Sequence, residues 1–104
     1  MSLVDARGLV AHDLHGRWAD LLEAAVASRA WWLEQWPDGA PYVPGLLAQD
    51  VQEAVHAGPD PTWPLCRSCG DHPLLVEPDL GADPFWVCHR SGLPVAEVGR
   101  LPRT

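Results

Sequence analysis

Residues 66–70 read Cys-Arg-Ser-Cys-Gly, and residues 88–92 read Cys-His-Arg-Ser-Gly. The second segment keeps the leading Cys and the closing Gly of the first, but Ser91 stands where a second Cys would complete the repeat. A C-x-x-C turn lets two thiolates converge on one point, and the Gly that follows can take the left-handed backbone conformation that such a turn needs. The two segments therefore indicate two ligand-bearing turns that one metal ion could join.

The residues between and after these turns have the pattern of β-strands. Residues 73–77 and 84–88 predict two strands around a turn at 79–83, and residues 94–98 predict a shorter third strand. Proline and glycine bound each of these runs, as is typical of strand ends. We expect a β-hairpin or three-stranded sheet here, and a frayed chain end over residues 101–104.

The first 58 residues have the periodicity of helices. Ser2 and Asp5 can form the capping box of a first helix, which Gly8 and Gly16 weaken and which we expect to break near Gly16. Apolar residues then recur at steps of three and four, which predicts one long helix over roughly residues 13–36. Pro44 suits the first turn of a second helix, which Gly58 would end. The short connection between the two predicts an antiparallel helical hairpin.

With Cys66, Cys69, Gly70, Cys88 and Gly92, the C-terminal part resembles the zinc-ribbon group. It is also similar to small actinobacterial proteins that carry a tryptophan-rich helix ahead of a C-terminal ribbon. The resemblance covers residues 63–99 and implies no activity, because zinc ribbons serve many unrelated functions. We therefore predict an α+β protein in one domain, residues 1–104, whose helical part (1–58) packs on a zinc-ribbon-like part (63–99).

A structural zinc site takes four Cys or His ligands in a tetrahedron. Three are named by the motif: Cys66, Cys69 and Cys88. The hydroxyl of Ser91 stays protonated near neutral pH, so the fourth ligand is expected to be His72 or His89. Neighbouring residues on a strand point to opposite faces, so His89 is expected to point away from the metal that Cys88 binds. This favours His72 as the fourth ligand. The predicted site is Cys66, Cys69, His72 and Cys88 with a structural Zn²⁺.

Three other interpretations of the cysteines stay open at this level. The motif could be a decayed ribbon with reduced, buried thiols, or a redox dithiol, although no βαβ pattern surrounds it. A catalytic zinc would need an open position, and the spacing places no acid–base pair of Glu and His beside it. We therefore predict no enzymatic activity, and we expect His12, His15 and His56 to be surface or capping residues.

The net charge of −7 bears on the class of partner. Residues 1–60 hold nine acids and three Arg, whereas residues 61–104 hold five acids and four Arg. An acidic chain repels phosphate backbones, so nucleic-acid binding is disfavoured unless Arg67, Arg90 and Arg100 gather on one face. The N-terminus lacks a basic leader and the chain lacks a long apolar run, which predicts a cytoplasmic protein with no membrane contact.

Six tryptophans are many for 104 residues. Trp18, Trp32 and Trp36 share one helical stripe and are expected in the core, whereas Trp31 lies about 100° from Trp32 around a helix. An exposed Trp31 would mark a partner or self-association surface. The sequence favours a zinc-binding protein–protein interaction module or accessory subunit. The alternatives are a ribbon that binds nucleic acid or the transcription machinery, and a metalloenzyme or dithiol redox protein.

Overall fold

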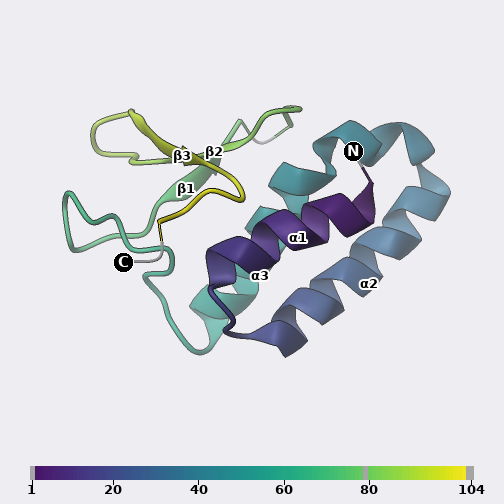
Figure 1. The fold of residues 1–104 in the computed structure, drawn as a ribbon, viewed down its shortest axis with the longest axis horizontal. Helices are drawn as coiled ribbons and strands as arrows, with labels where there is room; N and C mark the ends of the chain where they lie inside the picture. The colour runs from purple at the N-terminus through teal and green to yellow at the C-terminus, as the bar shows by residue number, and fades with distance from the viewer. Residues whose placement is uncertain (1, 79, 103–104) are drawn as a thin grey trace.

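Within residues 2–78 and 80–102, which the computed structural model describes, three α-helices precede a three-stranded antiparallel sheet (Figure 1). The helices are α1 (Leu3–Leu14), α2 (Ala19–Gln35) and α3 (Val43–Ala57), with a 3-10 turn, η1 (Pro37–Tyr42), ahead of α3. The predicted α+β class is confirmed. In these described ranges, no helix has the length and apolar character needed to cross a membrane.

A tight reversal at residues 15–18 separates α1 from α2, so the single helix predicted over residues 13–36 is wrong. His15, Gly16 and Trp18 have φ angles of 52°, 81° and 53°. A right-handed helix cannot continue through such left-handed residues. The apolar spacing persists across the reversal because Leu14 and Trp18 both face the same core. The predicted helical hairpin is therefore a layer of three helices that contact one another.

The helix ends follow the local signals of the sequence. The capping box at α1 is confirmed: the Asp5 N–H donates to Ser2 Oγ at 3.1 Å, and the Ser2 N–H donates to the Asp5 carboxylate at 3.3 Å. The predicted second helix is confirmed as α3, with Pro44 in its first turn and Gly58 at its C-terminal cap. Along one side α3 buries three valines and Leu47, which places it at the centre of the fold.

The sheet consists of β1 (Leu75–Glu77), β2 (Phe85–Val87) and β3 (Pro94–Glu97) in the order β1-β2-β3. Trp86 pairs with Val76 on one side and Ala96 on the other, and an irregularity follows at Trp86/Val87. The three predicted strands are thus present with shorter bounds. The turn predicted at 79–83 includes residue 79, which lies outside the described residues.

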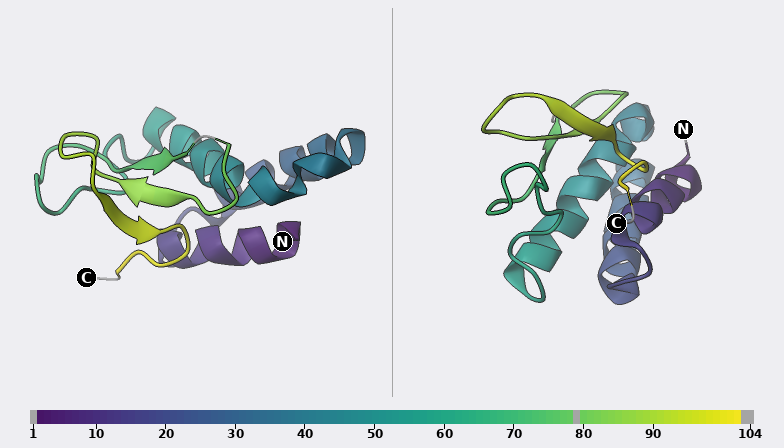
Figure 2. Two further views of the ribbon diagram at one scale, coloured as in Figure 1. Left: turned by 90° about the horizontal axis from the view of Figure 1, so that it is seen from above. Right: turned by 60° about the vertical axis from the view of Figure 1, so that its left-hand side comes forward.

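One hydrophobic core joins the two halves of the chain. It combines α1 and α3 with the ribbon residues Trp63, Leu74, Val76 and Trp86. The sheet covers α1 and α3, and α2 lies on the far side of the helical layer (Figures 1 and 2). Leu101 is also buried in this core, so the chain end is not frayed at that position, and residues 103–104 lie outside the described range. The core thereby fixes the base of the two ligand-bearing turns.

Candidate metal centre

The two predicted turns have the same backbone geometry. The Gly70 N–H donates to the Cys66 carbonyl at 2.7 Å, and the Gly92 N–H donates to the Cys88 carbonyl at 2.7 Å. Both glycines have left-handed φ angles, 79° and 74°. A side chain at either position would be strained, which explains the Gly in each motif. The turns lie at the same end of the sheet (Figure 1).

Four side chains meet between these turns and could hold a metal ion: Cys66, Cys69, His72 and Cys88, called here the Cys3His cluster. Their ligand atoms all lie within 4.8 Å of one another. Cys69 Sγ lies 3.9 Å from Cys88 Sγ, and His72 Nε2 lies 3.8 Å from Cys88 Sγ. Sulfur ligands of a tetrahedral zinc, at ~2.3 Å from the metal, lie about 3.8 Å apart. The spacing therefore suits a tetrahedral cation.

His72 presents the ring nitrogen that a metal needs. Its Nδ1 lies 2.9 Å from the Pro73 carbonyl oxygen. Because a carbonyl only accepts, Nδ1 carries the proton and the lone pair of Nε2 faces Cys88. The His89 ring packs against the His72 ring at a centroid distance of 4.4 Å and is exposed. His72 thus lies inside the cluster and His89 lies outside it.

Backbone contacts fold His72 back onto the first turn. The Cys66 N–H donates to the His72 carbonyl at 2.9 Å, and Leu65 and Pro73 form an isolated β-bridge. The ligand loop therefore closes on itself, so that a residue three positions after Cys69 returns to the thiols. This closure brings into one cluster the four side chains that the sequence indicated.

Two polar side chains of α3 hold the base of this loop. Gln52 donates from Nε2 to the Leu74 carbonyl at 2.6 Å and to the Trp63 carbonyl at 3.3 Å, and His56 Nε2 lies 2.6 Å from the same Trp63 oxygen. Sequence reasoning missed Gln52. A polar residue on an apolar helix face is a sign of a buried hydrogen bond. Gln52 has this position on α3 between Val51 and Val55, and it is buried there.

Ser91, at the position of the missing cysteine, acts as a hydrogen-bond donor. Its hydroxyl, followed by its backbone N–H and that of Arg90, lowers the pKa of Cys88 from 9.0 to about 6. Burial is the main cause that raises the pKa of Cys69. A hydrogen bond to the charged form of a thiol favours that form, whereas loss of water disfavours it. The Ser91 hydroxyl therefore favours the thiolate of Cys88, which is the form that binds a cation.

A surface ion pair joins the two turns. Arg90 Nη2 lies 3.2 Å from Asp71 Oδ1, and both side chains are more than half exposed, at 56% and 62%. Pairs with this exposure are screened by water and contribute little to stability. The ion pair nevertheless compensates the positive charge of Arg90 at the rim of the cluster.

The nearest cleft opens beside one member of the cluster. It has a volume of about 280 Å³ and lies between the end of α1, the first turn and Leu101. Among the described residues that line it, Cys66 is the one member of the Cys3His cluster, and its side chain is only 1% exposed. The cleft therefore does not open onto the other three ligand atoms.

The tryptophans divide between core and surface. Trp18 and Trp32 are half-buried against the core, as predicted. Trp36, predicted in the core, is 44% exposed because α2 ends at Gln35 and the chain turns there, while Trp31 is 64% exposed. His15 caps the C-terminus of α1, in line with its expected capping role.

Comparison with known proteins places this arrangement in a family. A family model described as Domain of unknown function (DUF8819) matches residues 1–98. The matched range takes in the helical layer, the sheet and the whole Cys3His cluster. No curated protein and no solved structure matches the chain.

Proposed function

The chain belongs to the DUF8819 family, and we propose that it is a non-enzymatic protein-interaction module whose sheet is held by a structural Zn²⁺ in the Cys3His cluster. The observation that carries this proposal is the convergence of four protein ligand atoms within 4.8 Å. Because the turns and the sheet share one core with α1 and α3, an ion bound there would also fix the sheet on the helical layer.

The donor set favours zinc over other common cations. Three sulfurs and one imidazole nitrogen are ligands that bind zinc well, whereas magnesium and calcium take oxygen ligands. The Nδ1–H of His72 is held by the Pro73 carbonyl, and Ser91 donates to Cys88. Such outer hydrogen bonds orient ligands and retain metal affinity.

A structural role is favoured over a catalytic one. The four protein donors fill a tetrahedron, so a bound zinc would keep no position for water or substrate. The neighbouring cleft reaches Cys66 alone among the four, and that thiol is almost fully covered. The burial of Cys66 also weighs against a dithiol redox role for this thiol, which needs an accessible thiolate, whereas Cys69 is half-buried.

Charge favours a protein partner over nucleic acid. Arg90 is paired with Asp71, Arg67 lines the cleft beside Cys66, and Arg100 lines a different hollow next to Leu9 and His12 of α1. The two hollows adjoin at Leu101 and Pro102, but Asp71 compensates the charge of Arg90, so a phosphate-binding face of three unpaired Arg side chains is not favoured. With a net charge of −7, the chain is better suited to a protein surface than to a polyanion.

Substitution of Co²⁺ for zinc tests the ligand set directly. The metal-free, reduced protein is titrated with Co²⁺, and we expect one equivalent to produce intense visible bands and a thiolate charge-transfer band. These signals report tetrahedral sulfur-rich coordination. His72→Ala should weaken the visible bands, and His89→Ala serves as the matched control. Weak bands typical of six oxygen ligands, or no binding at all, would refute the site.

A further inference from the structure

An open groove of about 510 Å³ runs between α2 and α3. Gln52 faces the ribbon, and Asp50, which lines the groove, lies about 200° away from it around α3. The groove therefore opens on the side of the helical layer that faces away from the sheet. Small side chains form much of its floor: Ala24, Ala25, Ser28 and Ala54. Such residues let another backbone approach closely.

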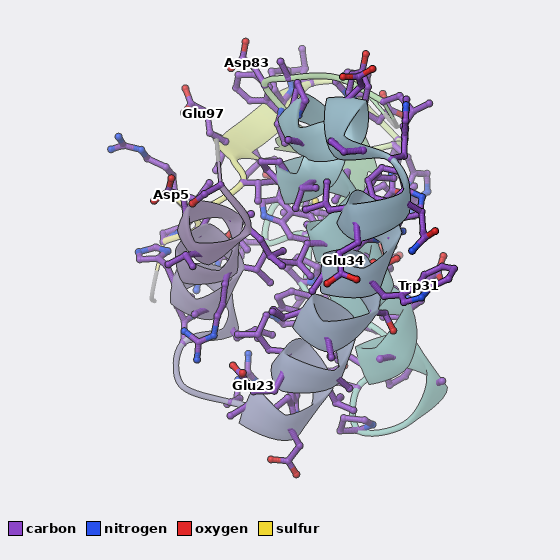
Figure 3. The ribbon with its side chains drawn as sticks, turned by 90° about the vertical axis from the view of Figure 1, so that its right-hand side faces the viewer. Asp5, Glu23, Trp31, Glu34, Asp83 and Glu97 are labelled. Carbon is purple, nitrogen blue, oxygen red and sulfur yellow. The ribbon has the colours of Figure 1, made fainter. Side chains whose placement is uncertain are left out.

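Trp31 borders this groove and is its main exposed apolar group. Its side chain is 64% exposed, and it projects from α2 into solvent (Figure 3). A large aromatic side chain beside a shallow floor of small residues is typical of an anchor for a protein partner. Leu21 and Trp32 line the rest of the groove. The surface can therefore bury apolar side chains of a partner without rearrangement of the core.

The charges around the groove are acidic. Arg29, which lines it, is bound by Asp50 through two hydrogen bonds of 2.6 and 2.9 Å, so its charge is compensated. Asp20 is exposed on α2, about 20° around the helix from Trp31, and Glu53 is exposed on α3. A partner with positive charges would complement this rim.

Resting on the proposed interaction role, we infer that this groove binds a cationic amphipathic helix of another protein. Apolar side chains of that helix lie in the groove against Trp31, and its Arg or Lys side chains meet the acidic rim. From Leu21 to Trp31 the groove follows about 15 Å of α2, enough for roughly three turns of a partner helix. Two copies of this chain would bring two acidic rims together, so a heterologous partner is favoured over a second copy.

The test uses the zinc-loaded full chain and a pair of synthetic peptides. The first is an 18-residue amphipathic helix of Leu, Ala and Arg, and the second carries Glu at each Arg position. Binding is measured by fluorescence anisotropy of labelled peptide at two salt concentrations. We expect saturable 1:1 binding that is at least about 10-fold tighter for the cationic peptide.

Two tryptophan variants decide whether the groove is the site. Trp31→Ala is expected to weaken binding by about 10-fold or more. Trp36→Ala is the matched control, since Trp36 is also exposed but does not line the groove, and its affinity should stay within about twofold. Zinc content of each variant is measured in parallel, so loss of peptide binding with zinc retained is distinct from failure of the metal centre.

Several results would overturn the inference. Equal affinity for both peptides would show that the acidic rim does not select a cationic partner. Equal losses of peptide affinity in Trp31→Ala and Trp36→Ala would show nonspecific binding. A native dimer in sedimentation that Trp31→Ala converts to monomer would assign the groove to a second copy. Failure of both peptides to bind, with zinc present, would refute the groove and leave the metal site standing.

Discussion

The indole Nε1–H of Trp86, on β2, donates a 2.8 Å hydrogen bond to Oδ2 of Asp13 at the end of α1. Asp13 is fully buried. The same carboxylate accepts from the backbone N–H groups of Gly99 at 2.6 Å and Leu101 at 3.0 Å. One side chain of the helical layer thus joins the central strand and the returning chain end, which fixes the sheet against α1.

Asp13→Ala is therefore expected to destabilise the protein by about 3–5 kcal/mol, because it removes the acceptor of the buried Trp86 indole, the buried Leu101 N–H and the half-buried Gly99 N–H. Urea denaturation followed by near-UV circular dichroism measures the change. Asp20→Ala, at an exposed position on α2, is the control and should change stability by less than about 0.5 kcal/mol. Equal effects of the two substitutions would show that the Asp13 carboxylate does not fix the sheet against α1.

Gln52→Leu tests the support that α3 gives to the ligand loop. Loss of the amide leaves the Leu74 carbonyl without its 2.6 Å donor, and we expect a cost of about 1–3 kcal/mol together with faster zinc release. Zinc transfer to a chromogenic chelator measures the release rate. Gln35→Leu, at the exposed end of α2, is the control. A release rate unchanged from that of native protein would contradict the proposed support.

Removal of the metal should unfold the sheet. Structural zinc in small domains contributes on the order of 10–16 kcal/mol of apparent binding energy, which exceeds the stability of most domains of this size. Chelation is expected to abolish the near-UV signal of Trp63 and Trp86, which are in contact in the core. Zn²⁺ should restore that signal and Mg²⁺ should not. A native spectrum that survives complete chelation would refute a stabilising metal.

Ser91→Ala should raise the pH at which acid displaces zinc from the protein, because protons compete better for Cys88 once its pKa is higher. The Ser91 hydroxyl is the largest cause that lowers this pKa to about 6, so its loss moves the value toward 9.0. Because the folded-state pKa is lowered, the stability that Cys88 contributes is complete above about pH 9 and is lost as the pH falls through about 6. A chromogenic chelator present during an acid titration follows the release of zinc. Ser68→Ala is the control, and identical midpoints for the two variants would contradict the assignment.

The ion pair of Arg29 with Asp50 is expected to couple α2 to α3. Its side chains are 20% and 28% exposed and two hydrogen bonds join them, so a double-mutant cycle should give about 1 kcal/mol. The coupling should fall at 1 M salt, because part of the pair is open to solvent. A coupling of zero at low salt would show that the pair does not stabilise the helical layer.

Local patterns in the sequence account for most of the fold and for the cluster. The glycines after each turn, the alternation in 73–98 and the position of His72 three residues after Cys69 predict the sheet and the four side chains that meet. The cluster depends on short-range geometry, since a loop from Cys66 to His72 closes through its own backbone. Such geometry leaves a signature in residue spacing.

Long-range features leave no such signature. Asp13 is joined to Gly99 and Leu101 across 86 and 88 residues, so no local pattern indicates that this acid is buried. The reversal at residues 15–18 is indicated only by Gly16, because Leu14 and Trp18 face the same core from two different helices and the apolar spacing imitates one continuous helix.

The measurement that tests the central claim most directly is the zinc content of freshly purified, reduced protein by elemental analysis, with His72→Ala and His89→Ala prepared in the same way. We predict one zinc per native chain, retained in His89→Ala and lost or strongly reduced in His72→Ala, because His72 Nε2 faces Cys88 and His89 lies outside the cluster. Absence of zinc from the native protein would contradict the account, as would zinc that stays in His72→Ala and leaves His89→Ala.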